Sequence, residues 1–250
     1  MKPSVRLGKI AGIQVGLHYS WFFVPGLVAW SMAQELLPDQ YPGWASATYW
    51  GTGVSIGIML SVSVLIHEMA HSLVARSRGI PPGEITLFLL GGVSSIEGVA
   101  RRARDEFVVA IVGPLASLLL AGLVWLLLLV LGDGDSPLDA VAAYTVRINV
   151  VLAAFNLLPA FPLDGGRVLR SVLWAVTGSP MLATRIATLG GQLFGVALIA
   201  LGVYVFATGY PLGGVLFVLL GLFLQRMAAR TRAEDVKEAE DAALQTDDVP

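Results

Sequence analysis

The chain has 250 residues, of which 56% are hydrophobic and only 14% are charged, and its mean hydropathy is +0.74. A soluble domain is closer to half apolar and a quarter charged, so this composition is typical of a membrane protein with several spans. The net charge of −2 gives no basis for nucleic-acid binding. The absence of cysteine excludes disulfides and thiolate ligands, which leaves His, Asp and Glu as possible metal ligands.

Six apolar segments follow one another along the chain. Each approaches or exceeds the length that spans a bilayer, except the last, which is short. They predict an all-α polytopic membrane protein with six transmembrane helices. The expected segments are Tyr19–Leu37, Tyr49–Ala75, Phe107–Leu131, Ala140–Phe161, Ala183–Ala207 and Leu212–Leu224.

The second segment contains His67, Glu68 and His71 in the sequence SVSVLIHEMAHSLVARS. Two histidines four residues apart share one face of a helix and can both reach one zinc ion, while the glutamate between them can act as a general base. Titratable residues at membrane depth are costly, so their presence there favours a function, namely metal-assisted hydrolysis. The alternative is a helix whose histidines hydrogen-bond neighbouring helices.

Residues 79–104, between the second and third segments, are too apolar for an ordinary loop and too broken for a span. Pro81-Pro82-Gly83 stops the preceding helix, and the residues around Gly91-Gly92, including Val93–Ile96, predict a short hairpin. Non-helical backbone at membrane depth survives only where it is buried in protein or lines a wet cavity. We therefore expect a small membrane-associated β-element, either re-entrant beside the metal site or interfacial without a catalytic part.

A third zinc ligand should be a carboxylate, because a catalytic zinc takes three protein ligands and one open position. Asp164 is the best candidate, since Pro159 and Pro162 break the helix before it and Gly165-Gly166 follow it. Helix breaks are the usual place for polar sites within a membrane. The alternative is that Asp164 caps the helix that follows.

Asn149 and Asn156 are seven residues apart and share one face of the fourth segment. Asn156 is close enough to the Asp164 turn to donate a hydrogen bond to a substrate carbonyl or a developing oxyanion. Interhelical hydrogen bonding is an equal alternative for Asn156 and the preferred interpretation for Asn149.

The basic residues predict the orientation of the segments. Fifteen of the 16 Lys and Arg residues lie before the first segment, around the connection between the second and third, around the connection between the fourth and fifth, or after the sixth. The other three connections, near residues 38–48, 132–139 and 208–211, hold none. By the positive-inside rule both termini should be cytoplasmic. His71 and Asp164 each precede a basic residue closely (Arg76 and Arg167), which places both toward the cytoplasmic side. Residues 229–250 are expected to form an acidic cytoplasmic tail, partly disordered, after a transmembrane domain of residues 1–228.

These motifs resemble the site-2 protease family of intramembrane zinc metalloproteases. The resemblance rests on HEMAH at residues 67–71 and NLLPAFPLDGGR at 156–167, with weaker support from GKIAGIQVGLHYSW at 8–21 and from Gly91-Gly92. The resemblance covers about residues 8–228. It is to the short prokaryotic form of the family, without a recognisable C-terminal CBS domain in this chain. His18 matches a family histidine to which we assign no ligand role.

The resemblance implies one Zn²⁺ per chain held by His67, His71 and Asp164, with Glu68 as the general base. It also implies that Asn156 engages the substrate, and that the β-element with Gly91 and Gly92 holds the substrate as an added strand.

We therefore expect a zinc-dependent endopeptidase that cleaves transmembrane segments of membrane-tethered proteins near the cytoplasmic side, in regulated intramembrane proteolysis. The expected location is the bacterial cell (inner) membrane. Its partners would be the lipid bilayer and single-span membrane proteins already cut by another protease, with no nucleic acid. The alternative is a membrane zinc transporter or metal-binding protein that uses the same ligands, and a third class is an inactive relative that acts as a scaffold.

Overall fold

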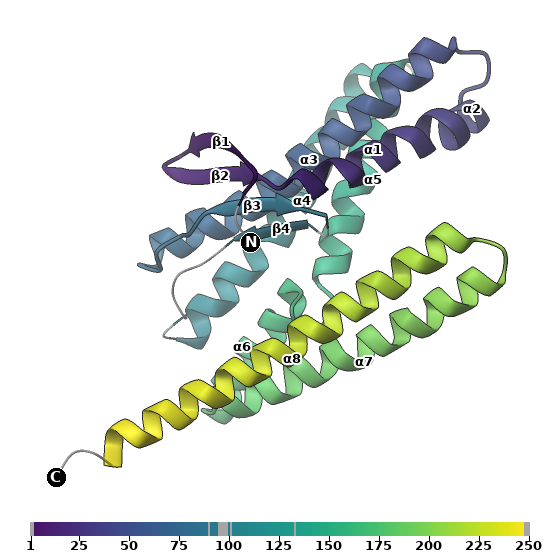
Figure 1. The fold of residues 1–250 in the computed structure, drawn as a ribbon. Helices are drawn as coiled ribbons and strands as arrows, with labels where there is room; N and C mark the ends of the chain where they lie inside the picture. Colours follow the sequence, from purple (N-terminus) through teal and green to yellow (C-terminus); the bar gives the residue numbers. More distant parts are fainter. Residues whose placement is uncertain (1–2, 90, 95–99, 101, 133, 248–250) are drawn as a thin grey trace. The chain divides into compact units, whose positions relative to one another are not determined.

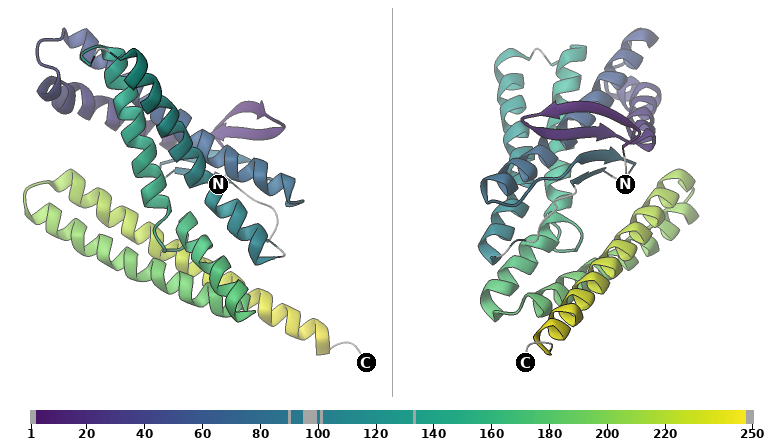
Figure 2. Two further views of the ribbon diagram at one scale, coloured as in Figure 1. Left: turned by 180° about the vertical axis from the view of Figure 1, so that it is seen from behind. Right: turned by 60° about the vertical axis from the view of Figure 1, so that its left-hand side comes forward.

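The structure is a computed structural model that describes residues 3–89, 91–94, 100, 102–132 and 134–247 (Figures 1 and 2). The helices are α1 (Phe23–Ser31), α2 (Leu37–Gln40), α3 (Ser46–Ser77), α4 (Ala103–Leu131), α5 (Pro137–Asn156), α6 (Asp164–Thr177), α7 (Pro180–Ala207) and α8 (Pro211–Asp247). The strands are β1 (Val5–Ile10), β2 (Ile13–Leu17), β3 (Ile85–Phe88) and β4 (Gly91–Ser94). The chain forms two compact units, Met1–Val99 with Val112–Phe155, and Ala100–Ile111 with Asn156–Pro250.

Within the described residues, five helices are long and apolar enough to cross a membrane. They are α3, α4, α5, α7 and the part of α8 from Gly213 to Thr231. These helices coincide with the second to sixth segments predicted from the sequence, and they support an integral membrane protein.

The first predicted segment, Tyr19–Leu37, is helical but not one regular α-helix. It begins as a 3₁₀ turn (Tyr19–Phe22), continues as the nine residues of α1, passes through a π-helical turn (Met32–Leu36) and ends in α2. A π-turn shifts the hydrogen-bond pattern within a helix and so interrupts its regular α-helical geometry. The segment is therefore not among the five spanning helices, and six spans remain a prediction.

The predicted β-element is present as half of a four-stranded sheet with the order β1-β2-β3-β4. β3 and β4 pair antiparallel, with Phe88 opposite Gly91, while Ser95 and Ile96 of the predicted hairpin lie outside the described residues. β2 pairs parallel to β3, with Val15 opposite Ile85. The all-α prediction did not include β1 and β2, because each is short and β2 meets its partner β3 only after α3 has intervened.

β1 and β2 form a hairpin with a two-residue turn. Ala11 (φ 48°) and Gly12 (φ 81°) are both left-handed, as a type I′ turn requires. Arg76, near the end of α3, donates from Nη1 to the Ala11 carbonyl at 2.7 Å. This bond attaches the hairpin to the helix that carries the two histidines.

The sheet packs on α3 through one apolar core. β3 is buried along its whole length. The buried members of the core are Ile13, Val15, Trp21, Val64, Met69, Ile85 and Leu87. Since Met69 follows Glu68 directly, this packing holds the sheet beside the histidine turn of α3.

α5 is joined to α3 within the same unit by apolar and polar contacts. A second core contains Leu37, Ile56, Ala140 and Tyr144. The fully buried Asn149 donates from Nδ2 to Ser63 Oγ at 2.8 Å and to the Thr145 carbonyl at 2.9 Å. The interhelical role preferred for Asn149 is thereby confirmed.

In the second unit, α7 and α8 form an antiparallel pair that lies side by side in every view (Figures 1 and 2). A Cβ at Gly195 would lie 2.9 Å from the Gly221 carbonyl oxygen, and a Cβ at Gly202 would lie 2.7 Å from that of Gly214. Glycines thus allow the two backbones to approach closely, as is common between membrane helices.

A buried ion pair links the start of α4 to α6 in this unit. Arg170 donates from Nη1 to Glu106 Oε2 at 2.6 Å, and their side chains are 12% and 5% exposed. The Nε of Arg170 also donates to Thr184 Oγ1 on α7 at 2.6 Å. One guanidinium therefore connects three helices.

Candidate metal centre

His67 and His71 lie one turn apart on the same face of α3, and their Nε2 atoms are 3.2 Å apart. Both side chains are buried, with 3% and 4% of their surface exposed. Two nitrogens bound to one tetrahedral zinc at about 2.0–2.1 Å would be separated by about 3.3–3.4 Å. The separation of the pair is therefore within about 0.2 Å of the one that a shared zinc ion requires.

The ring of His67 is oriented by α4. Its Nδ1 lies 3.0 Å from Oγ of Ser117, a side chain with 1% of its surface exposed. A hydrogen bond at Nδ1 leaves Nε2 available to a metal and would fix the ring plane, as is common for metal-binding histidines. Sequence reasoning missed Ser117, although a serine within a strongly apolar helix was a signal that could have found it.

α4 also approaches the histidines through a residue without a side chain. A Cβ at Gly113 would lie 2.8 Å from His67 Nε2, 2.5 Å from His71 Cε1, and closer still to His71 Nε2. Gly113 and Ser117 are four residues apart, so they share the face of α4 that meets the histidine face of α3. The sequence analysis did not single out Gly113 either.

Glu68 lies against the β-sheet. A Cβ at Gly92 would be 2.7 Å from Cδ of Glu68 and 2.9 Å from its Oε1. Gly91 precedes it in β4 with φ 130°, a conformation that glycine adopts readily. The structure thus brings Gly92 together with the helical turn that carries His67, Glu68 and His71.

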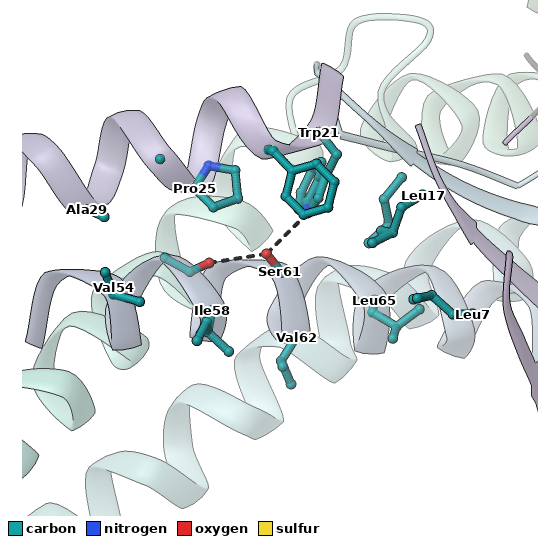
Figure 3. A pocket seen from close by; sticks show the side chains of 14 residues that line it. Leu7, Leu17, Trp21, Pro25, Ala29, Val54, Ile58, Ser61, Val62 and Leu65 are labelled. Carbon is teal, nitrogen blue, oxygen red and sulfur yellow. Dashed lines mark hydrogen bonds between the residues drawn. The ribbon is translucent and has the colours of Figure 1, made fainter. Parts of the chain in front are cut away.

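A pocket of about 440 Å³ lies between α1 and α3 (Figure 3). From α3 its lining includes Ile58, Ser61 and Leu65. Ser61 Oγ accepts a hydrogen bond from Trp21 Nε1 at 3.2 Å and donates to the Gly57 carbonyl at 3.1 Å. These two polar side-chain atoms of the lining are therefore already hydrogen-bonded. Leu65 is three residues before Glu68, so the α3 residues that line this apolar pocket lie on the same side of the helix as Glu68.

Asp164 lies in the second unit, at the helix break predicted from the sequence. α5 ends at Asn156, the peptide bond between Phe161 and Pro162 is cis, and α6 begins at Asp164. The cap residue of α6 is Leu163, so Asp164 occupies the first helical position, with 8% of its surface exposed. Asn156 is half-buried.

His18 has a local structural role. It precedes the first helical turn, and its Nδ1 lies 2.7 Å from Ser20 Oγ and accepts from the Ser20 backbone amide. The ring nitrogen Nδ1 of His18 is thus engaged with the first helical turn.

Comparison with known proteins gives consistent matches. Residues 55–133 and 133–202 match Peptidase family M50. The chain is 37% identical over 226 residues to a protein named putative zinc metalloprotease Rip3 of Mycobacterium tuberculosis, covering 90% of this chain and 57% of that protein. It is 38% identical over 254 residues to putative zinc metalloprotease sll0528 of Synechocystis, covering 98% and 65%. The chain thus spans about three fifths of the length of these relatives.

A solved structure also resembles this fold. The site-2 protease from Methanocaldococcus jannaschii matches with a TM-score of 0.61 and 26% sequence identity, covering 91% of this chain and 94% of that one. Both relatives are named as zinc metalloproteases, and imidazole nitrogens such as those of His67 and His71 are ligands that zinc accepts. The histidine turn, the helix break at Asp164 and these matches together show that the chain belongs to peptidase family M50, the site-2 protease family of zinc metalloproteases.

Proposed function

We propose that the protein is a zinc-dependent intramembrane endopeptidase in which His67, His71 and Asp164 hold one zinc ion. The observation that carries this proposal is the pair of buried imidazoles, with Nε2 atoms 3.2 Å apart, on a helix long and apolar enough to span a membrane. Asp164 is the preferred third ligand because it is a buried carboxylate at a helix break, within a segment that matches the family.

Glu68 is the proposed general base. When bound, zinc lowers the pKa of a water molecule and polarises the scissile carbonyl. Glu68 removes a proton from the attacking water, holds it on its carboxylate, and delivers it to the leaving amine. Asn156 is proposed to donate a hydrogen bond to the oxyanion that develops on the carbonyl.

The substrate is proposed to be a transmembrane segment of a membrane-tethered protein. Helical carbonyls are hydrogen-bonded, so the segment must unwind before a peptide bond can be attacked. β4 is an end strand of the sheet formed by the described residues, and its Gly92 contacts Glu68. These observations support an unwound substrate that adds to the sheet beside β4, at Gly91 and Gly92, and thereby presents a bond to Glu68.

The topology and the cellular role are further parts of the proposal. We propose that the first predicted segment, Tyr19–Leu37, is an additional span. We also propose that residues 1–228 form the transmembrane metalloprotease domain and that residues 229–250 form an acidic cytoplasmic tail. We place both termini on the cytoplasmic side of a bacterial inner membrane, and the site would then lie toward that side. Cleavage there would release the cytoplasmic part of a single-span regulator that another protease has already trimmed.

The proposal is tested with purified protein in detergent and a transmembrane substrate. Glu68→Gln should keep its zinc and lose cleavage by about 10²–10⁴-fold, because it removes the base and keeps the metal ligands. Asp164→Asn should lose cleavage and should also bind zinc more weakly, because it removes a proposed ligand. Unchanged cleavage in Glu68→Gln would exclude Glu68 as the base. If the protein cleaves nothing in detergent and carries zinc into vesicles after reconstitution, a transporter would be favoured instead.

A further inference from the structure

A residue outside the ligand set faces both zinc-binding nitrogens. We propose that Gly113 on α4 is a positioning residue of the zinc site, because its missing side chain leaves the space that the ion needs. This inference rests on the proposed zinc site and deepens it by assigning a residue that neither binds the metal nor moves a proton.

The geometry of the two imidazoles carries the inference. A Cβ at Gly113 would lie 2.8 Å from His67 Nε2 and closer still to His71 Nε2. An ion shared by two nitrogens 3.2 Å apart must lie within about 2.0–2.1 Å of both of them. A methyl group at residue 113 would therefore compete with the ion for the same small volume.

The register of the two helices explains why residue 113 meets this position. Ser117 holds His67 through Nδ1 at 3.0 Å, which fixes α4 against α3 at that level. One turn earlier on α4, the same face presents Gly113 to the Nε2 atoms. Any side chain at residue 113 would point toward the imidazole pair.

Two glycines of α3 serve a different purpose from Gly113. A Cβ at Gly53 would lie 2.6 Å from the Ala29 carbonyl oxygen, and a Cβ at Gly57 would lie 2.7 Å from that of Pro25. Those glycines allow two backbones to approach. At Gly113, the nearest atoms are the tips of two side chains, which can rotate away. Gly113→Ala should therefore fold and should displace the imidazoles from their metal-binding positions.

The experiment compares the wild type, Gly113→Ala and Gly122→Ala in detergent. Gly122 lies on the same helix, and a Cβ there would meet no atom within 4 Å among the described residues, so Gly122→Ala is the matched control. Zinc affinity is measured by competition with a chromophoric chelator. We expect Gly113→Ala to bind zinc about 10–100-fold more weakly, the range seen when groups around a metal site are altered, and Gly122→Ala to match the wild type. Wild-type zinc affinity in Gly113→Ala would overturn the inference.

A second measurement separates this role from simple helix packing. The thermal midpoints of the metal-free proteins are compared with and without His71→Ala, which removes the ring tip that the new methyl group would meet. Gly113→Ala should lower the midpoint less in the His71→Ala background than in the wild type. An equal decrease in both backgrounds would overturn the inference. A wild type that binds zinc and cleaves no transmembrane substrate would contradict the proposed peptidase function alone.

Discussion

Gly92 of β4 lies directly against Glu68 of α3, so closely that a Cβ at Gly92 would be 2.9 Å from Glu68 Oε1. The sheet therefore meets the proposed general base at a glycine, where no side chain separates the strand backbone from the carboxylate. This contact links the element proposed to receive the substrate to the group proposed to move the proton.

Gly92→Ala should reduce cleavage and leave zinc in place. The added methyl group would displace the Glu68 carboxylate, and general-base catalysis contributes at least about 10²-fold, so we expect a loss of that order in kcat. Zinc content and cleavage rate are measured on the same preparation. Gly51→Ala is the control, because Gly51 lies on α3 with open space around its Cβ position. Equal activity in Gly92→Ala and Gly51→Ala would show that the contact between Gly92 and Glu68 does not position the proposed base.

Ser117→Ala should weaken zinc binding. It removes the hydroxyl 3.0 Å from His67 Nδ1, and loss of such a partner costs about 10–100-fold in metal affinity. The affinity is measured by chelator competition. Ser55→Ala is the control, since Ser55 Oγ donates to the Gly51 carbonyl of its own helix at 2.8 Å. If both variants bind zinc equally, Ser117 does not orient His67.

The ion pair between Glu106 and Arg170 should respond differently to single and double substitution. Glu106→Leu alone leaves a largely buried guanidinium without its carboxylate, which should lower the free energy of unfolding by up to about 3–5 kcal/mol. Glu106→Leu combined with Arg170→Met replaces both charges by apolar groups and should recover most of this loss. Thermal and denaturant unfolding in detergent measure both effects, and an equally unstable double variant would refute the explanation.

Asn149→Ala should destabilise the protein modestly without affecting the metal. The change removes the bonds to Ser63 Oγ and to the Thr145 carbonyl, and interhelical hydrogen bonds in membranes contribute about 0.6–2 kcal/mol. Unfolding in detergent and zinc affinity are measured together, with Ser63→Ala as the reciprocal variant. A large loss of zinc affinity in Asn149→Ala would show a role beyond joining α5 to α3.

Part of this architecture was predictable because it depends on neighbours along the chain. The four-residue spacing of His67 and His71 places them on one face of any α-helix. Pro159 and Pro162 cannot continue a helix, so α5 ends before them whatever its neighbours are. Five of the six predicted apolar segments coincide with helices of spanning length. The ligand role of Asp164 and the substrate role of Asn156 remain predictions.

The missed features of the fold are a long-range strand pairing and a local change of helix type. The pairing of Val15 with Ile85 makes β2 a neighbour of β3, and nothing in the short sequence of β2 indicates that partner. The π-helical turn at Met32–Leu36 interrupts a segment whose composition is that of an ordinary span.

Residue type and helical spacing are local properties of the chain, so they predict the ligand types of the proposed centre without any tertiary contact: two imidazoles on one helix face, with a carboxylate between them. The surroundings of these side chains depend on how distant elements pack together. The register of α4 against α3 places Ser117 at His67 Nδ1 and Gly113 at the Nε2 atoms, and the sheet places Gly92 at Glu68. That register results from the packing of whole helix and sheet surfaces, which no short stretch of sequence contains.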